Sequence, residues 1–330
     1  MRRCGERTYT RDPVTKAHLS LREGSRADLP ATFALSERTV YDAAVRQDLL
    51  PAGASPSDGD VERRWQQQRG LIEFIAEQPG GSYLICENDD GPVGYARVAR
   101  FGEMEELTEL MVDPGHQNQG VGRALLERCW PGDPSPEMGR LVIATGAPAD
   151  LSLYTTFGVM PVAGHWHLRQ GTEEYLERRS KEIDASEPGI HVLKADRAVK
   201  EWQRLEPEAI SHERPRLHEF FGRDRTCLAR VDDVTGDAIA LCWVSGDGEI
   251  GPAVGTRPQD LVPVVLAALD RVAMTQEPSS LALYVSSIAW WLLRRMRNLG
   301  FRVHWPSWIL CSRPLPGLDR YMPTRPPHLL

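Results

Sequence analysis

The 330-residue sequence lacks a basic excess, a long apolar segment and a leader-like start. It has 39 Lys and Arg against 46 Asp and Glu, and its net charge is -7, so we expect no nucleic-acid partner. The longest largely apolar stretch, residues 261–269, is far shorter than the roughly 20 residues that cross a bilayer, so no membrane partner is expected. No hydrophobic segment follows the charged residues 1–7, which favours a cytoplasmic protein without a signal peptide.

Paired cysteines and metal-binding patterns are also missing. The six cysteines form no C-x-x-C pair and most lie in apolar stretches, so neither disulfides nor structural zinc is expected. His165 and His167 would project from the same face of a strand, but no third ligand candidate lies near them in the sequence. We therefore expect no metal site.

The pattern of apolar runs and turns predicts an α/β chain with two domains. The first half reads as strands at residues 19–22, 83–86, 93–98, 107–112, 141–144 and 162–168. One helix is expected to start near residue 28, two more to span about 61–78 and 120–130, and a short one to run through residue 154. Residues 50–60 read as a loop, and Asn88 to Gly91 as a hairpin turn. Residues 169–188 are rich in Glu, Arg and Lys and read as an exposed connecting helix or a linker. The prediction is a flexible N-terminus over 1–17, a domain over 18–170, a linker over 171–188 and a domain over 189–330.

The second half repeats the order of the first at a constant offset of 142 residues. Val112 then corresponds to Val254 and Gly158 to Gly300, with no insertion between them. The fold class is therefore a mixed α/β fold of two tandem, related domains, each a mostly antiparallel central sheet flanked by helices.

One segment of the first half is built to hold an anion. Residues 109–126 read as a strand, a glycine-bearing loop and an amphipathic helix. Gly120 and Gly122 let backbone N–H groups approach a ligand closely, and the helix N-terminus adds a partial positive charge. The natural ligand of such a loop is a phosphate group, although neither G-x-x-x-x-G-K-[ST] nor G-x-G-x-x-G is present.

This segment resembles the acyl-CoA-binding signature of the GNAT superfamily of N-acetyltransferases. In that signature V-x-P precedes [Q/R]-x-x-G-x-[G/A], and Val112, Pro114, Gln117, Gly120 and Gly122 stand at those places. Residues 154–159 resemble the Y-x-x-x-G-F element of the same superfamily, with Val in place of Phe. The resemblance is clear over residues 18 to about 168 and reaches the second half only through the repeat.

The resemblance implies acetyl-CoA as cosubstrate, with its amine acceptor attacking the thioester directly. It implies cofactor contacts along the end of the strand and the start of the helix, at Met111, Val112, Asp113, Gln117, Asn118, Gln119, Gly120, Val121, Gly122, Arg123 and Ala124. A backbone N–H of Met111 or Val112 would face the oxygen that becomes negative. Tyr154 would protonate the departing thiolate, unless it is a half-buried core residue.

A protonated amine must lose a proton before it attacks, so a carboxylate or a water chain is expected beside the acceptor. Four glutamates lie within residues 103–109, and we expect Glu109 to be the base, with Glu106 as second choice. Strand alternation puts Glu103, Glu105 and Glu109 on one face and Glu106 on the other unless a bulge intervenes. A solvated hairpin edge is the alternative for the whole cluster.

The second half departs from the signature, because Val262 and Val264 replace the two glycines and Met296 replaces the tyrosine. We expect this domain to be degenerate and to do no chemistry. Residues 289–293 offer apolar area for core or interdomain packing, or for an acceptor pocket. Residues 211–218 form a polar cluster that reads as a solvated loop, or as part of the active cleft.

The functional hypothesis is an acetyl-CoA-dependent N-acetyltransferase acting on a primary amine of a small molecule or peptide. The acidic cluster favours a cationic acceptor such as an aminoglycoside-like amine, a polyamine or a peptide N-terminus, which is consistent with antibiotic self-resistance or secondary-metabolite tailoring. A non-catalytic acyl-CoA-binding regulatory module is the alternative. A monomer or a homodimer is expected.

Overall fold

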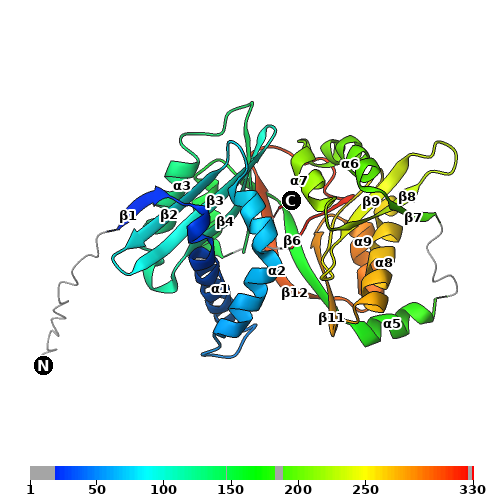
Figure 1. The fold of residues 1–330 in the computed structure, drawn as a ribbon, viewed down its shortest axis with the longest axis horizontal. Helices are drawn as coiled ribbons and strands as arrows, with labels where there is room; N and C mark the ends of the chain where they lie inside the picture. Colours follow the sequence, from blue (N-terminus) through cyan, green and yellow to red (C-terminus); the bar gives the residue numbers. More distant parts are fainter. Residues whose placement is uncertain (1–18, 146, 183–188, 326–328) are drawn as a thin grey trace, which may run out of the picture.

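The computed structural model describes residues 19–145, 147–182, 189–325 and 329–330 as a mixed α/β fold with two similar halves (Figure 1). The first half contains β1 (Ser20–Glu23), α1 (Leu29–Arg46), α2 (Asp58–Ala76), β2 (Ser82–Asn88), β3 (Gly91–Phe101), β4 (Met104–Val112), α3 (Val121–Cys129), β5 (Gly139–Ala144), α4 (Pro148–Thr155), β6 (Met160–Gly171) and α5 (Thr172–Ser180). Short 3-10 turns at Arg26–Asp28 and Pro114–His116 precede α1 and α3.

The second half repeats this order. It contains β7 (Ile190–Leu193), α6 (Ala195–Ile210), α7 (Pro215–Phe221), β8 (Thr226–Val231), β9 (Ala238–Val244), β10 (Ile250–Gly255), α8 (Pro258–Thr275), β11 (Ser280–Ser286), α9 (Trp290–Asn298), β12 (Arg302–Cys311) and β13 (Tyr321–Met322). The predicted fold class is confirmed. The predicted flexible segment at residues 1–17 lies outside the described residues.

Two element boundaries differ from the prediction. Helix α2 begins at Asp58, inside the predicted loop, because the Ser57 hydroxyl accepts the Asp60 N–H at 3.1 Å and caps the helix. Strand β6 continues to Gly171, so it enters the charged stretch that reads as a connection, and α5 follows it directly.

The two halves exchange their last long strands. One eight-stranded sheet has the order β1-β2-β3-β4-β5-β12-β6-β11, so β12 of the second half lies between β5 and β6 of the first. The other sheet has the order β13-β10-β9-β8-β7. At the centre of the exchange His165 pairs with Ser307, and these two residues are themselves separated by the repeat offset of 142. A local twofold relation between the halves therefore passes through this pair, and the two halves share one sheet (Figure 1).

Helices cover both faces of the first half of the large sheet. On one face α1 and α2 pack Phe33, Trp65 and Ile72 against strands β2 and β3. On the other face α3 and α4 pack against β3, β4 and β5. A further apolar cluster joins α2 and β5 to α6, α7 and β9 of the second half. Among the described residues, no helix combines the length and the apolar character needed to cross a bilayer.

The tryptophans at the start of α9 do not pack as predicted. Trp290 and Trp291 are 62% and 60% exposed, while Ala289 and Leu292 are buried. Helical periodicity explains this result, since Ala289, Leu292 and Met296 share the inner face of α9. The prediction that this run serves core or interdomain packing is therefore wrong for both indole rings.

The histidine pair on β6 faces an aromatic ring. Both imidazoles stack on Tyr284, at centroid distances of 5.4 Å for His165 and 4.6 Å for His167. The part of the chain that the structure describes contains no group of three or more side chains suited to bind a metal ion.

Acidification should destabilise the protein partly through His167. Burial, together with His304 and Arg169, lowers the pKa of His167 to about 4, below its ordinary value of 6.5. The unfolded chain therefore takes up this proton first, so the stability contributed by neutral His167 is present above pH 6.5 and is lost as the pH falls toward 4. Between pH 7 and 4.5 we expect His167→Phe to lose about 2 kcal/mol less unfolding free energy than wild type in urea titrations. The exposed-site control His191→Phe should keep the wild-type dependence; equal slopes in all three proteins would contradict the argument.

Candidate active site

Strand β4 separates from its parallel neighbour β5 halfway along its length. The two strands pair from Met104 with Gly139 to Leu107 with Val142, and β4 then continues alone on this side to Val112. The Asp113 N–H donates to Val93 O on β3 at 2.9 Å, so by the alternation of an antiparallel ladder the N–H groups of Val112 and Leu110 point toward the gap. The same alternation turns the Met111 N–H toward β3, which favours Val112 over Met111 as the donor.

A bulge in β4 changes which glutamates share a face. The β3–β4 register shifts so that Arg97 faces Glu109 and Ala99 faces Glu106, leaving Thr108 as the extra residue. Because Arg97 and Ala99 are two residues apart, Glu109 and Glu106 point to the same side of the sheet, toward α1 and α2. The exception allowed for a bulge therefore applies, and Glu106, not Glu105, shares a face with Glu109.

Glu109 lies at the border of the buried region, with 7% of its surface exposed. The Tyr95 hydroxyl donates to its Oε1 at 2.8 Å, and the Arg97 guanidinium lies 3.1 Å from its Oε2. Arg97 is fully buried between the Tyr83 and Tyr95 rings, each 5.0 Å from its guanidinium carbon. The Glu109 carboxylate is thus held in one place beside the gap between β4 and β5.

Glu106 is enclosed by the second half of the chain. Its Oε1 lies 2.8 Å from His212 Nε2 and 3.3 Å from the Arg214 guanidinium, and its Oε2 accepts the Leu330 N–H at 3.1 Å. Burial opposes ionisation, but Arg214 and His212 outweigh it and hold the pKa of Glu106 below its ordinary value. A fully buried, triply bonded carboxylate cannot reach an amine, so the geometry argues against Glu106 as the alternative base.

The polar cluster at residues 211–218 is part of this buried network. Arg214 also donates to Glu206 at 2.5 Å, and His218 Nε2 lies 2.8 Å from the second Glu206 oxygen. His212, Arg214 and His218 are all buried, so the solvated-loop prediction is wrong for them. Sequence reasoning missed the network because its members come from β4, α6, α7 and the C-terminal segment.

The glycine-bearing loop is open toward solvent. Gly120 has φ +90° as the N-terminal cap of α3, and Asn118 has φ +61°, conformations that turn the chain tightly into the helix. A Cβ at Gly120 would meet nothing within 4 Å, and one at Gly122 would meet only side chains at 3.6–3.8 Å. No side chain caps α3, so its first N–H groups face this open space.

The predicted cofactor residues lie together along the end of β4, the following turn and the first turn of α3. Gln117 fixes this loop, since its Nε2 donates to Val112 O and its Oε1 accepts from Arg46, both at 3.0 Å. Arg46 and Arg38 reach the loop from α1, with Arg38 at 4.0 Å from Asp113. Sequence reasoning missed both arginines, because only the packing of α1 beside the end of β4 brings them here.

Tyr154 lies on α4 in the apolar layer under α3, with 7% of its surface exposed. Its hydroxyl makes no hydrogen bond to any described residue, and burial raises the pKa of Tyr154 far above its ordinary value. Its neighbour Leu153 lies beside Gly122, so α4 packs next to the loop. The hydroxyl is therefore a neutral hydrogen-bond donor that gives up its proton reluctantly.

In the second half, the protein's own residues occupy the region that corresponds to this loop and gap. Helix α8 begins at Pro258, so the residues that correspond to the loop are already helical, and Val264 is fully buried. The buried Asp260 carboxylate accepts bonds from Thr256, Arg257 and Arg230. Strand β13 pairs with β10 through Val254, the counterpart of Val112, and occupies the edge that β4 leaves open.

Residues 79–158 match the family model described as "Acetyltransferase (GNAT) domain". The chain is 28% identical over 119 residues to a protein of Amycolatopsis mediterranei (strain U-32), and 38% identical over 86 residues to one of Clavibacter sepedonicus. Both relatives are named mycothiol acetyltransferase. The matches cover 32% and 26% of this chain and 33% and 27% of the relatives, so the chain spans about a third or less of their length.

Two solved structures are similar over almost the whole chain. A putative acetyltransferase from Pyrococcus horikoshii has a TM-score of 0.66 at 14% identity, covering 96% of this chain and 97% of that one. A tandem GNAT protein from the clavulanic acid biosynthesis pathway has a TM-score of 0.57 at 14% identity, covering 90% and 99%. At these identities the likeness concerns the fold, which in both cases extends through the two halves.

Proposed function

We propose, from the match of residues 79–158 to the GNAT acetyltransferase model, that the chain is an acetyl-CoA-dependent N-acetyltransferase acting on a primary amine of a small molecule or peptide. The observation that carries the proposal is the gap beside β4, which opens at Leu107 and runs directly to the glycine-bearing start of α3. The gap exposes backbone N–H groups, and the loop offers uncapped N–H groups with room for a phosphate.

The residues of this region fit acetyl-CoA. Gly120 and Gly122 leave the space that a pyrophosphate needs, and the α3 N-terminus adds partial positive charge. Arg38 and Arg46 lie at the same end, where they pair with Asp113 and Asp42. The Val112 and Leu110 N–H groups would align the pantetheine arm and donate to the carbonyl oxygen as it becomes negative. When bound, acetyl-CoA supplies an activated acetyl thioester.

Glu109 would accept the proton of the attacking amine. Its carboxylate is near the gap, is fixed by Tyr95 and Arg97, and faces the side of the sheet opposite α3. The loop that would hold the phosphates lies at α3, so the acceptor would approach from the α1/α2 side, where Glu109 points. Tyr154 would donate a hydrogen bond to the leaving sulfur from the α3/α4 side.

Glu109→Gln should slow turnover about 10²-fold near neutral pH and recover as the pH approaches the pKa of the acceptor amine, because a base matters less when the amine deprotonates in water. The measurement is the pH profile of the single-turnover rate. Glu105→Gln is the matched control, since the bulge turns Glu105 to the opposite face, and it should leave the profile unchanged. A profile displaced by the same factor at every pH would instead make Glu109 a substrate-binding residue.

Tyr154→Phe should slow the chemical step about 10- to 10²-fold, while acetyl-CoA affinity and thermal stability stay near wild type. The expected effect lies at or below the low end of the range for a general acid, because burial raises the pKa of Tyr154 and favours hydrogen bonding over full proton transfer. Single-turnover kinetics measure it. Met296→Tyr, which restores the hydroxyl in the second half, should add no activity; a loss below about threefold in Tyr154→Phe would make Tyr154 a packing residue.

The test of the proposed function is thiol release from acetyl-CoA in the presence of a pooled amine panel that includes polyamines, amino sugars, dipeptides and an amine of the mycothiol type. Mass spectrometry should find products heavier by one acetyl group. Acetyl-CoA binding without transfer to any metabolite in a cell extract would favour the non-catalytic acyl-CoA-binding module.

A further inference from the structure

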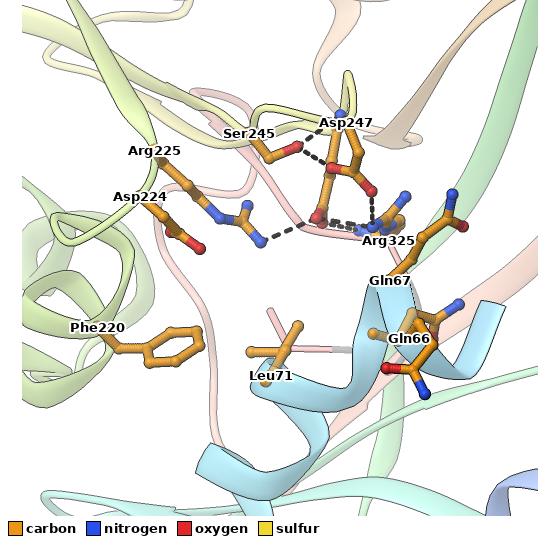
Figure 2. A pocket seen from close by; sticks show the side chains of 12 residues that line it. Gln66, Gln67, Leu71, Phe220, Asp224, Arg225, Ser245, Asp247 and Arg325 are labelled. Carbon is orange, nitrogen blue, oxygen red and sulfur yellow. Dashed lines mark hydrogen bonds and ion pairs between the residues drawn. The ribbon is translucent and has the colours of Figure 1, made fainter. Parts of the chain in front are cut away.

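A cleft of about 280 Å³ lies between α2 and the second half of the chain (Figure 2). Leu71 of α2 forms its floor, Phe220 and Arg225 stand on one side, and Asp247 and Arg325 close it above. Clefts between domains with a few converging polar groups are common small-molecule sites. The cleft therefore has the position of such a site and room for part of a small polar ligand.

The arginines of the cleft are already paired. Arg225 donates to Glu249 at 2.8 Å and to Gly251 O at 3.0 Å. Arg325 donates to Asp247 at 2.7 Å, and its Nε lies 3.3 Å from Glu249. Glu249 is almost completely buried between the two guanidinium groups. These pairs stiffen the rim and neutralise its positive charge, so the cleft is not suited to an anion.

The groups left for a ligand are acidic, amide and aromatic. Asp224 is exposed, and its carboxylate has no hydrogen bond or ion pair within the described residues. The side-chain amides of Gln67 and Gln68 are likewise unpaired in that part of the chain. The Phe220 ring stacks on Phe74 at 4.5 Å, and the guanidinium carbon of Arg223 lies over the ring at 6.0 Å from its centroid. This set matches a ligand with a positive charge, several hydroxyl groups and an apolar part.

The cleft lies on the same side of the sheet as Glu109, because α2, which lines it, packs over β2 and β3 on that side. Leu71 belongs to the apolar cluster that includes Ala99 of β3 and Ile143 of β5. Ala99 faces Glu106, which shares a face with Glu109 because of the bulge, and Ile143 lies where β5 has left β4. An acceptor approaching Glu109 from this side would therefore extend along α2.

We propose that this cleft binds the part of the acceptor that is not acetylated, and that the acceptor is a hydroxyl-rich amine with at least one further positive charge. The inference rests on the proposed function, which it deepens by naming the substrate class.

Calorimetry on the full chain, without acetyl-CoA, tests the ligand class with three probes. Neamine has ring hydroxyls and several ammonium groups, spermidine has only the charges, and N-acetylglucosamine has only the hydroxyls and the ring. We expect neamine to bind at least about tenfold more tightly than either of the others. Equal binding of spermidine would overturn the hydroxyl requirement, and no binding of neamine would overturn the proposal.

Two pairs of variants locate the binding. Gly70→Leu fills the cleft, and its Cβ would meet only the tip of the Phe220 ring at 3.9 Å, so folding should be intact. We expect it to abolish neamine binding, whereas Gly59→Leu, on the same helix with nothing within 4 Å, should have no effect. Asp224→Asn should weaken neamine at least tenfold, and Asp233→Asn, which removes the same charge from an exposed turn, should not.

Kinetics separate this inference from the proposed function. With neamine as acceptor, Gly70→Leu should raise KM at least tenfold while the affinity for acetyl-CoA stays unchanged. Acetyl transfer to neamine with the same KM in Gly70→Leu and wild type would overturn the cleft as an acceptor site and leave the N-acetyltransferase function standing. The acceptor-site inference would also be overturned if neamine binds in the cleft but is never acetylated, while another amine is acetylated.

Discussion

Gly122→Val should abolish acetyl-CoA binding, with a loss of affinity of at least about 10²-fold by calorimetry, and leave the fold intact. The added Cβ would meet Leu153, Val112 and Leu110 at 3.6, 3.7 and 3.8 Å, which are ordinary contacts. The two methyl groups of valine would then extend into the open space beside the first N–H groups of α3. A phosphate could no longer approach those groups closely.

Three controls make this result specific. Gly122→Ala should lose less affinity, because one methyl group takes less of the space, and Gly59→Val, in the first turn of α2, should lose none. The midpoint of thermal unfolding should not fall in any of them, since φ of Gly122 and Gly59 is not positive. Undiminished binding by Gly122→Val would move the cofactor site away from α3.

The second half carries a valine at the position that corresponds to Gly122. Its Val264 stands where Gly122 does and is buried in the core under α8. Asp260 supplies an internal carboxylate to Arg230 and Arg257, and β13 covers the edge of β10. The Asp260 carboxylate and strand β13 thus occupy the two places that the phosphates and the pantetheine arm of acetyl-CoA would take in the first half. This arrangement supports the proposal that only the first half binds acetyl-CoA.

Local patterns in the sequence were sufficient to predict the strand, loop and helix around Gly120 and Gly122. Their spacing, the hairpin at Asn88 to Gly91 and the repeat offset all depend on residues close in sequence or on a constant shift. The offset even reappears in space, because His165 pairs with Ser307 at the centre of the shared sheet.

Features that depend on long-range pairing could not be predicted in this way. The exchange of β6 and β12 needs two strands 142 residues apart to prefer each other to neighbours in their own halves. The bulge at Thr108 adds one residue to β4, and a single extra residue reverses the facing of everything before it. Alternation alone could therefore not show that Glu106 and Glu109 point the same way.

The buried network around Arg214 links the two halves chemically. Glu106 comes from β4, Glu206 from α6 and Tyr321 from β13, and all three bond Arg214. Every member is almost fully buried, so its charges are balanced by one another and not by water. Glu106 therefore serves to hold the second half against β4, close to Glu109 on the same strand.

Arg214→Met should destabilise the protein by about 3–5 kcal/mol at pH 7, because it leaves the buried carboxylates of Glu106 and Glu206 without their guanidinium partner. Burial opposes ionisation of both groups, but Arg214 and the neighbouring histidines keep the pKa of each carboxyl below its ordinary value. A lowered folded-state pKa contributes stability that is present above about pH 4.5 and is lost as the pH falls further. Without Arg214, burial would raise the pKa of both carboxyls, so in the variant they would take up protons, and lose their uncompensated charge, at a higher pH than in wild type. The difference between variant and wild type should therefore be largest at pH 7 and shrink toward pH 4.

Urea titrations at both pH values measure this difference, and matched variants define its cause. Arg216→Met removes an exposed arginine two residues away, in the first turn of α7, and should cost less than about 0.5 kcal/mol. Arg214→Lys keeps the charge without the planar fork and should fall between the two. If Arg214→Met does not fold, the double variant Arg214→Met/Glu206→Gln should recover part of the stability, because one uncompensated charge is then gone. A loss below about 1 kcal/mol for Arg214→Met at pH 7, or a loss that does not depend on pH, would mean that apolar packing and not this network holds the second half on β4.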